Sequence, residues 1–331
     1  MKSESANVHA LMLFSGGVDS QLALCLLRDQ GVSVRAVTFS HPLCAVVDAK
    51  QVAAQWSVEH RVEDISSALI KALERTGPSG CRDGAPCQIL HAEMLRRAKG
   101  LLREYRCHFL VTGETLSDRF PWQTVEGFAH MDRSAGCEGL VVRPLSAKLL
   151  AETEPERQEW IRRDDLGAFK GRCEKERLRL AGHYKIMVPE GRGTECCILN
   201  ETFARRVEDL KQHEGLSGTR VLQWLRMGRH FRVGERAKLI LGRNEKENAE
   251  LEGRTELYDL LLRPENVRGP AAILPFTASQ SEIRRAAAIC VRYSDAGEGD
   301  SIRVRVRSAQ GTSSVEAQPA SPEEIERCRV H

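Results

Sequence analysis

The segment Ser15-Gly16-Gly17-Val18-Asp19-Ser20 constrains the fold of this 331-residue chain more than any other feature. It follows the apolar run 8–14 and precedes a helical pattern over 19–30, which ends at Gly31. Two adjacent glycines let main-chain N–H groups turn toward one point, and the N-terminus of the next helix adds partial positive charge. Serine hydroxyls can donate further hydrogen bonds to phosphate oxygens. The segment therefore predicts a phosphate-binding loop between a buried strand and a helix.

A helix that is simply capped after a tight turn is the structural alternative. It would need one glycine and one serine, and it does not account for five glycine or polar positions directly after a strand. The segment also lacks the Gly-Lys-Ser/Thr ending of a Walker loop. We therefore expect a nucleotide site built on a loop of another type.

Residues 8–112 alternate between strand and helix patterns. Strands are expected at 8–14, 32–39, 58–64 and 107–112, and helices at 19–30, 46–55, 66–75 and 89–103. Strands joined through helices pair in parallel and are covered by helices on both faces. The pattern predicts an α/β fold with a doubly wound parallel sheet.

The composition changes after Leu150 and again near Leu216. Residues 151–179 are dense in charge and are expected to be helical and to pack on the first domain. Later strand patterns at 237–241, 258–262, 272–274 and 302–306 accompany one helical pattern at 282–293. We expect a first domain at 1–150, a helical extension with a cysteine loop at 151–215, and a smaller C-terminal α+β domain at 216–331. The polar last twenty residues are expected to fray.

The overall composition is that of a globular protein, with 41% hydrophobic and 29% charged residues. No apolar run approaches the ~18–20 residues that a membrane-spanning helix needs. The N-terminus is polar and carries no pattern of a secretory signal, so a cytoplasmic protein without membrane contact is expected. A net charge of +3 gives no bulk nucleic-acid signature, although the segments 226–236 and 301–307 are locally basic.

The loop at 15–20 resembles the signature of the PP-loop ATP pyrophosphatase superfamily, Ser-Gly-Gly-x-Asp-Ser after the first strand. The resemblance implies the adenine nucleotide alpha hydrolase-like form of the doubly wound fold. It also implies cleavage of ATP between the α and β phosphates. The residues that would hold the pyrophosphate are Ser15, Gly16, Gly17, Asp19 and Ser20. Asp19 would lie near Mg²⁺, and a carboxylate beside phosphates does suit such a cation.

Three later segments resemble tRNA thiouridine synthases, so that the resemblance covers about residues 8–210. Residues 86–95 resemble a Pro-Cys-x-x-Cys-Lys-x-x-Met-Leu segment, and 109–119 and 142–148 resemble the second nucleotide-contacting loop. Residues 196–199 occupy the place of a Gly-Gly-Cys-Leu-Leu segment. The resemblance implies further ATP contacts from Thr112, Gly113, Glu114 and Arg119.

The cysteines depart from this family pattern. Cys87 matches the first cysteine of the family pair, but Leu90 stands at the second and His91 replaces the lysine. In relatives, the pair and a later cysteine either hold a [4Fe–4S] cluster or pass sulfur as a persulfide. Here Cys87 and Cys197 match, and Cys81 and Cys196 are the neighbours that could complete a cluster. A Cys87–Cys197 pair acting as nucleophile and resolving thiol, and loop cysteines without a role, are the alternatives.

The C-terminal region resembles the NFACT-R RNA-binding domain, most clearly at Gly242-Arg243-Asn244 and Asn248. The stripe Arg303, Arg305 and Arg307 has a spacing of two, which puts all three side chains on one strand face. We expect Arg243, Asn244, Arg303 and Arg305 to contact the RNA backbone. An exposed strand with ordinary solvating charge is the alternative.

Taken together, these features predict an ATP-dependent enzyme that thiolates tRNA uridine, with Asp19, Cys87 and Cys197 as catalytic residues. ATP and Mg²⁺ are the expected cofactors, with a [4Fe–4S] cluster as one route for sulfur. The expected partners are tRNA and a sulfur donor, either sulfide or the persulfide of a cysteine desulfurase. A homodimer is compatible with the sequence. The alternative function is an RNA-binding or nucleotide-sensing PP-loop protein that has lost sulfur transfer.

Overall fold

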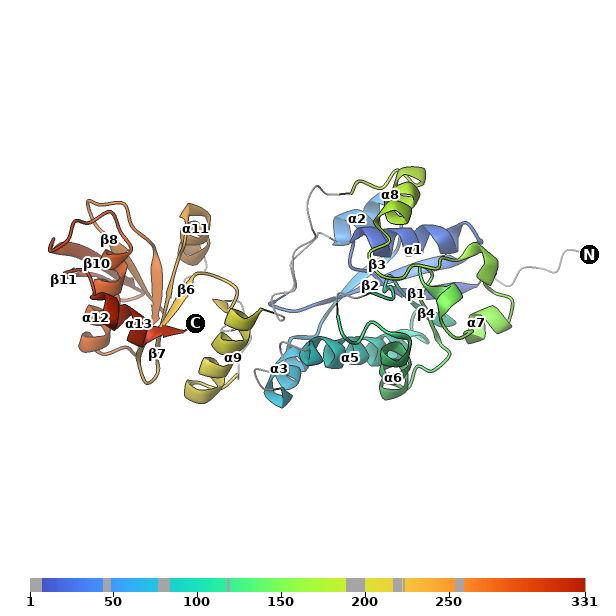
Figure 1. The fold of residues 1–331 in the computed structure, drawn as a ribbon, viewed down its shortest axis with the longest axis horizontal. Coiled ribbons are helices and arrows are strands. Elements are labelled where there is room, and N and C mark those ends of the chain that lie inside the picture. Colours follow the sequence, from blue (N-terminus) through green and yellow to red (C-terminus); the bar gives the residue numbers. More distant parts are fainter. Residues whose placement is uncertain are drawn as a thin grey trace, which may run out of the picture. The chain divides into compact units, whose positions relative to one another are not determined.

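The computed structural model describes residues 8–43, 49–76, 84–117, 120–188, 200–216, 222, 224–253 and 259–330. The chain divides into two compact units, residues 1–199 and residues 200–331. Each unit is described by itself below, with its elements labelled as in Figure 1.

A five-stranded, all-parallel sheet forms the centre of the N-terminal unit. Its strands are β1 (His9–Leu13), β2 (Ser33–Ser40), β3 (His60–Asp64), β4 (Phe109–Thr112) and β5 (Val141–Val142), in the order β3-β2-β1-β4-β5. The chain proceeds outward from β1 to β2 and β3, then returns to the other side of β1 for β4 and β5. This order confirms the expected doubly wound sheet and puts its topological switch point between β1 and β4.

Helices cover both faces of this sheet (Figure 1). One face carries α1 (Val18–Arg28), α2 (Ala49–Gln55) and α8 (Glu174–His183), and the other carries α3 (Ser66–Arg75), α5 (Ala85–Leu101) and α6 (Val125–Ala135). Because both faces are covered, the middle of β1 and all four residues of β4 are buried.

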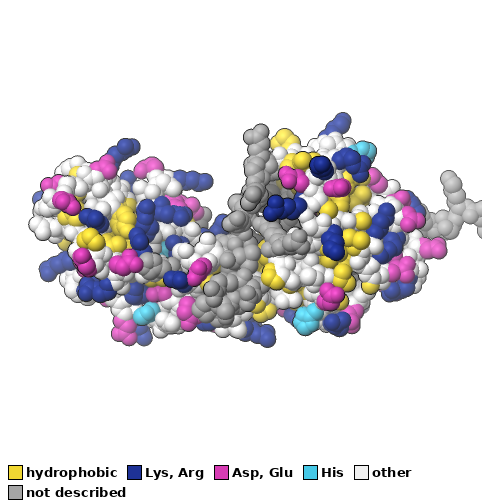
Figure 2. All heavy atoms as spheres, viewed as in Figure 1, with side chains coloured by type: hydrophobic (Ala, Val, Ile, Leu, Met, Phe, Trp, Pro, Cys, Tyr) yellow, Lys and Arg dark blue, Asp and Glu magenta, His cyan; other side chains and the backbone are white. Residues whose placement is uncertain are grey.

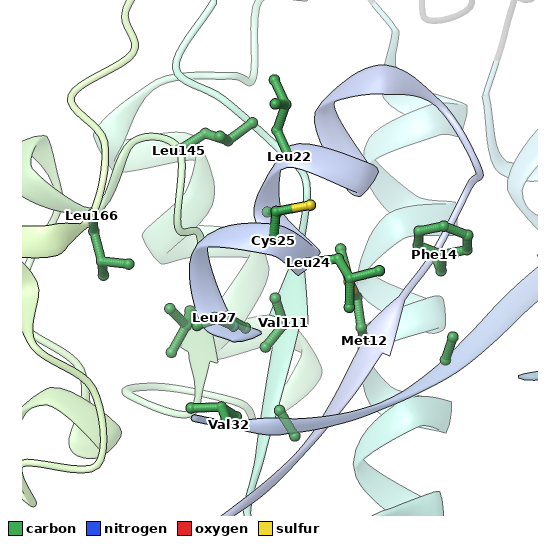
Figure 3. Close-up of a cluster of buried hydrophobic side chains, with 14 of the residues drawn as sticks. Met12, Phe14, Leu22, Leu24, Cys25, Leu27, Val32, Val111, Leu145 and Leu166 are labelled. Carbon is green, nitrogen blue, oxygen red and sulfur yellow. The ribbon is translucent and has the colours of Figure 1, made fainter. Parts of the chain in front are cut away.

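The core under α1 joins the beginning of the unit to its later segments (Figure 3). Leu22 and Leu27 of α1 pack with Met12 of β1 and Val111 of β4, and Leu145 and Leu166 belong to the same cluster. Cys25 lies in this cluster, and its burial raises the pKa of the thiol to about 11. A buried thiol of this kind packs as a small apolar side chain.

Residues 151–179 differ from the continuous helical pattern expected for them. They form the short helix α7 (Glu154–Arg157), the 3-10 turn η2 (Arg163–Asp165) and the first residues of α8. The segment is not helical at Gly167. There it runs so close to the preceding chain that an added Cβ would lie 2.4 Å from the carbonyl oxygen of Leu145. The close approach lets Leu166 and Phe169 enter the core of the N-terminal unit, so the segment packs on that unit as expected.

The C-terminal unit contains a seven-stranded antiparallel sheet in the order β11-β10-β8-β9-β7-β6-β12. Its strands are β6 (Arg229–Gly234), β7 (Ala237–Leu241), β8 (Asp259–Pro264), β9 (Ala272–Pro275), β10 (Ile302–Ser308), β11 (Gly311–Ala317) and β12 (Arg329–Val330). The helix α12 (Gln280–Arg292) packs on the sheet through Ile283, Ala287 and Cys290. The helices α9 (Glu201–His213), α11 (Glu245–Gly253) and α13 (Pro322–Cys328) complete the unit.

Two features of this unit correct the expected organisation. Asp209 of α9 forms ion pairs with Arg232 of β6 at 2.6 Å and with Lys238 of β7 at 2.8 Å. These contacts tie α9 to the C-terminal sheet, so the unit begins at residue 200 and not at 216. The last residues also do not fray, because β12 pairs with β6 and Ile325 of α13 is buried in the core.

No helix in the described part of the chain combines the length and apolar content that crossing a membrane requires.

Candidate nucleotide-binding site

The glycine loop lies at the carboxyl end of β1, where the sheet order reverses. Gly16 has a positive φ of 74°, a conformation that favours glycine, and Gly17 caps α1 in an extended conformation. The Ser20 hydroxyl donates to the Gly17 carbonyl at 2.7 Å, and the Gln21 amide donates to the Gly16 carbonyl at 2.9 Å. These two hydrogen bonds fix the loop against the first turn of α1. The geometry is that of an anion site at a helix N-terminus.

A second glycine turn packs directly against this loop. Leu13 and Thr112 are partners in the ladder of β1 and β4, so the two strands end at the same level. A Cβ added to Gly113 would lie 2.7 Å from both the nitrogen and the Cα of Ser20. The structure therefore brings the 15–20 loop and the 112–114 turn together at the switch point, where ligands of open α/β sheets bind.

Asp19 projects from the first turn of α1 and is held by Arg177 of α8. The Arg177 Nε donates to one carboxylate oxygen at 2.6 Å, and one terminal nitrogen donates to the other oxygen at 3.3 Å. Both side chains are partly exposed. Arg177 is the residue of this site that the sequence analysis missed. It lies among other basic residues of a charge-dense segment, so no sequence signal distinguishes it from Lys175 or Arg179.

The Glu114 carboxylate belongs to an ion network with Arg143 and the partly exposed His91. It accepts hydrogen bonds from the Thr112 hydroxyl at 3.0 Å and from Arg143 Nε at 3.0 Å, and its other oxygen lies 2.8 Å from His91 Nδ1. The same Arg143 donates two hydrogen bonds to Asp132 of α6, at 2.8 and 2.9 Å. The network thus joins β4, β5, α5 and α6 behind the Thr112–Glu114 turn.

The charges in this network stabilise one another. Burial by itself raises the pKa of Glu114, but Arg143, His91 and the Thr112 hydroxyl outweigh it and lower that pKa to about 2. Burial lowers the pKa of the Arg143 guanidinium, but Glu114 and Asp132 more than offset this, so the net shift is upward. Glu114 is therefore ionised at neutral pH. Its charge is matched by Arg143, which is 3% exposed.

The residues expected to contact ATP therefore do not all lie at one place. Ser15, Gly16, Gly17, Asp19, Ser20 and Gly113 share one region, Thr112 supports Glu114 from within, and Arg119 lies outside the described residues. A single carboxylate, Asp19, is compatible with Mg²⁺, which is typically held by one or two carboxylates together with substrate phosphates.

Among the expected sulfur-handling cysteines, the structure describes Cys87. It lies in the first turn of α5, and its residue is 7% exposed. Leu90, at the position of the second family cysteine, faces the core and is 3% exposed. Cys81, Cys196 and Cys197 lie outside the described residues, and no group of three His, Cys, Asp or Glu side chains suited to a metal occurs within the part that is described. The cluster and the persulfide route both stay predictions.

The expected RNA contacts in the C-terminal unit are exposed but already paired. Val304 and Val306 are buried while Arg303, Arg305 and Arg307 are exposed, which confirms that the stripe shares one strand face. Arg303 pairs with Glu316 at 3.0 Å, Arg305 with Glu265 at 2.6 Å, and Arg243 with Glu247 at 2.5 Å. The face drawn in Figure 2 likewise shows Lys and Arg interspersed with Asp and Glu on both units. None of these three arginines presents an unmatched charge.

The Gly242–Asn248 motif has a structural explanation. The Asn248 side chain is buried and accepts a hydrogen bond from the Ala271 amide at 3.0 Å. A Cβ on Gly242 would lie 2.2 Å from the same Asn248 oxygen. The Asn244 side chain accepts from the Glu247 amide at 3.0 Å in the first turn of α11. The motif therefore shapes the connection between β7 and α11 through Gly242, Asn244 and Asn248. The Asn244 side chain already accepts a hydrogen bond there.

Two family models match the chain. Residues 5–148 match the thiamine biosynthesis protein ThiI, and residues 228–329 match the NFACT protein RNA binding domain. The first match spans all five parallel strands and both glycine turns, and the second spans the antiparallel sheet from β6 to the start of β12. These matches confirm both resemblances drawn from the sequence, one for each unit.

Similarities to solved structures are distant. A 4-thiouridine synthetase in complex with RNA and ATP is 18% identical with a TM-score of 0.38, over 55% of this chain and 43% of that one. A predicted subunit of tRNA methyltransferase from Methanocaldococcus jannaschii DSM is 22% identical with a TM-score of 0.31, over 42% and 67%. The C-terminal part of the fibronectin/fibrinogen-binding protein from Streptococcus suis is 13% identical with a TM-score of 0.29, over 48% and 78%. The chain thus spans less than half the length of the 4-thiouridine synthetase. Comparison with curated proteins gave no significant match.

Proposed function

We propose that this protein uses ATP to activate a uridine of tRNA for thiolation. The observation that carries the proposal is the contact between two glycine turns at the switch point, where Gly113 packs on the first turn of α1. The same unit matches the ThiI model, and the other unit matches an RNA-binding domain. A nucleotide site and an RNA-binding module in one chain favour an RNA substrate over a small molecule.

In this proposal the loop at 15–20 holds the β and γ phosphates of ATP. Main-chain N–H groups and the α1 N-terminus stabilise charge that develops on the phosphates as the α–β bond breaks. Asp19 is the carboxylate that would hold Mg²⁺, which supplies further neutralisation when bound. Arg177 would leave the Asp19 carboxylate as the cation arrives and turn to the phosphate oxygens.

The proposed reaction has two stages. A uracil carbonyl oxygen attacks the α-phosphorus, the bond to the bridging oxygen breaks, and pyrophosphate leaves. The base is then held as an O-adenylate, so that its oxygen departs with AMP when a sulfur nucleophile attacks the ring carbon. Activation replaces a poor leaving group by a good one.

Sulfur would come from sulfide or from a persulfide carried on Cys87. With a persulfide, attack on the ring carbon leaves a Cys87 S–S–C link, and Cys197 then attacks the Cys87 sulfur. The thiouridine is released and a Cys87–Cys197 disulfide forms, which a cellular thiol must reduce before the next turnover.

The test is a comparison of tRNA nucleosides by mass spectrometry. A strain lacking the gene should lose one thiolated uridine, and the wild-type protein should restore it. The Asp19→Ala variant should not restore it, although it folds normally, because Asp19 is partly exposed. Retention of every thiolated nucleoside in the deletion strain contradicts the proposal.

A second candidate is a PP-loop protein that binds RNA and nucleotide without transferring sulfur. The buried Leu90 at the position of a family cysteine favours it, and so does the low exposure of Cys87. A purified protein that releases pyrophosphate in the presence of tRNA, but forms no thiouridine with sulfide or with a desulfurase persulfide, would establish this reading. An unaltered rate for Cys87→Ala in the thiolation assay would exclude Cys87 as the sulfur carrier and leave sulfide as the donor.

A further inference from the structure

A hollow of about 390 Å³ lies in the C-terminal unit, and Arg243, Arg303 and Arg305 are not among the residues that line it. It is bordered by the first residues of α9, by the start of β6 and by β12. Four arginines line it, Arg205, Arg206, Arg229 and Arg329, together with His230 and the carboxylate residue Glu201. Its volume is within the range of small-molecule sites and exceeds what a bare phosphate ion needs.

The arginines of this hollow outnumber the acidic groups around them. Arg205 pairs with Glu201 at 2.8 Å. Arg329 lies 4.0 Å from the Glu326 carboxylate and donates to the Tyr293 hydroxyl at 2.8 Å. Arg229 lies over the Tyr293 ring at 4.9 Å, and within the described residues it forms no ion pair. This contrasts with Arg243, Arg303 and Arg305, each of which has a carboxylate within 3.0 Å.

Arg206 adds a buried charge behind the hollow. It is 8% exposed, and its terminal nitrogens donate to the carbonyls of Leu225 and Gly228 at 2.8 Å each. Its Nε is buried without a hydrogen-bond partner in the part of the structure that is described, and no described carboxylate forms an ion pair with it. Burial lowers the pKa of this guanidinium to about 10, which still leaves it charged at neutral pH. Glu247 acts on Arg206 only through its charge, without a direct ion pair, and a buried cation that lacks such a pair is stabilised by an anion placed beside it.

His230, which also lines the hollow, is neutral. Burial, together with the charges of Arg206 and Lys238, lowers its pKa well below the usual value, so the ring is neutral. Its Nε2 lies 2.8 Å from the Met227 carbonyl and 3.1 Å from the Trp224 carbonyl. Since carbonyl oxygens only accept, Nε2 carries the proton. The guanidinium groups, and not the imidazole, supply the charge of the hollow.

We propose that this hollow is a binding site for a phosphate group of RNA, held by Arg229 and Arg329 in front of Arg206. Planar guanidinium groups bind phosphate oxygens in pairs, and Tyr293 orients both of the outer arginines by stacking and by its hydroxyl. The proposal rests on the proposed function in taking RNA as the source of the phosphate. It differs from the expectation drawn from the sequence, in which Arg243, Arg303 and Arg305 contact the RNA backbone.

The test measures the affinity of the full-length protein for an unmodified tRNA transcript over a range of salt concentrations. The Arg229→Ala/Arg329→Ala variant should bind at least about tenfold more weakly at ~100 mM salt, and the slope of log K against log salt should become shallower by about 0.9, because one phosphate contact is lost. The matched control Arg303→Ala/Arg305→Ala removes the same charge from paired side chains and should change the slope less. Arg229→Lys/Arg329→Lys should keep most of the slope, which separates charge from packing.

The source of the phosphate follows from two further probes. If removal of the 5′-phosphates from the transcript abolishes the difference between wild type and the alanine variant, the hollow binds the RNA end. If the difference survives, the hollow binds an internal phosphate; both results support the proposal.

Equal salt slopes for wild type and a folded Arg229→Ala/Arg329→Ala variant overturn it, and so does binding of inorganic phosphate or AMP at the hollow without any effect on RNA. Failure of the wild type to bind tRNA at all would refute the proposed function first. Circular dichroism and thermal unfolding show whether each variant is folded.

Discussion

Arg177 and Asp19 lie 158 residues apart in the chain, yet the Arg177 guanidinium donates two hydrogen bonds, of 2.6 and 3.3 Å, to the Asp19 carboxylate. The pair joins α8 to the first turn of α1, at the loop where the phosphates of a nucleotide are expected. The Arg177 guanidinium thus already occupies the carboxylate that, among the described residues, we propose as the Mg²⁺ ligand. Binding of a metal–nucleotide complex must therefore exchange one cation for another, and this exchange is accessible to experiment.

Asp19→Ala should lower pyrophosphate release by about 100-fold or more, because the carboxylate is the only described one beside the loop that can hold the metal. Enzyme-coupled detection of pyrophosphate measures the effect. Asp164→Ala, which removes an exposed carboxylate from the η2 turn, is the control and should leave the rate unchanged. Orthophosphate as the product, or full activity of Asp19→Ala, would disprove the assignment of the loop.

Arg177→Ala should lower the Mg²⁺ concentration that gives half-maximal pyrophosphate release by about two- to fivefold. The reason is that a partly exposed ion pair contributes only up to ~1 kcal/mol, and its removal frees Asp19 for the metal. Arg179→Ala, on an exposed position of the same helix, is the matched control. A higher Mg²⁺ requirement in Arg177→Ala would show that Arg177 helps to bind the complex more than it competes with the metal.

Gly113→Ala should separate the two glycine turns. The new Cβ would overlap the main chain of Ser20, which no side-chain rotation relieves, so the free energy of unfolding should fall by about 1–3 kcal/mol. ATP affinity should fall with it. In the control Gly100→Ala nothing lies within 4 Å of the added methyl, and helix propensity should raise stability by up to about 1 kcal/mol. Denaturant unfolding and nucleotide titration of both variants check the prediction, and unaltered ATP binding by Gly113→Ala would contradict it.

Glu114→Gln should remove a component of the acid sensitivity of the N-terminal unit. The folded-state pKa of about 2 lies below the ordinary value of 4.5, so the stabilisation by Glu114 is complete above pH ~4.5 and is lost as the pH falls toward 2. Wild type should exceed the variant by about 3 kcal/mol at pH 7, and the difference should shrink over that window. Glu126→Gln, at an exposed position of α6, is the control. A difference between wild type and Glu114→Gln that does not change with pH would show that Glu114 is not ionised in the folded protein.

Local sequence was sufficient for the glycine loop and for the parallel sheet around it. Both depend on interactions between near neighbours, namely the φ freedom of Gly16 and the alternation of buried strands with helices. The short strand β5 and the two-residue strand β12 were missed because their pairing partners, β4 and β6, are distant in the chain and supply most of their definition. Residues 200–215 were expected to belong to the extension of the first domain, but they group with the second unit, where Asp209 pairs with Arg232 and Lys238 of two later strands.

The sequence alone determined that this protein has a phosphate loop after its first strand, a doubly wound sheet and a second unit with locally basic segments that resembles an RNA-binding domain. Those properties follow from residue type and spacing, which are written in contiguous segments. Only the tertiary structure decided which of many charged residues are already matched and which are not. Arg243, Arg303 and Arg305 have carboxylates beside them, whereas Arg206 and Arg229 form no ion pair among the described residues. A charge is matched or unmatched according to what folding brings within a few ångströms of it, because Coulomb attraction depends on distance in space and not on separation along the chain.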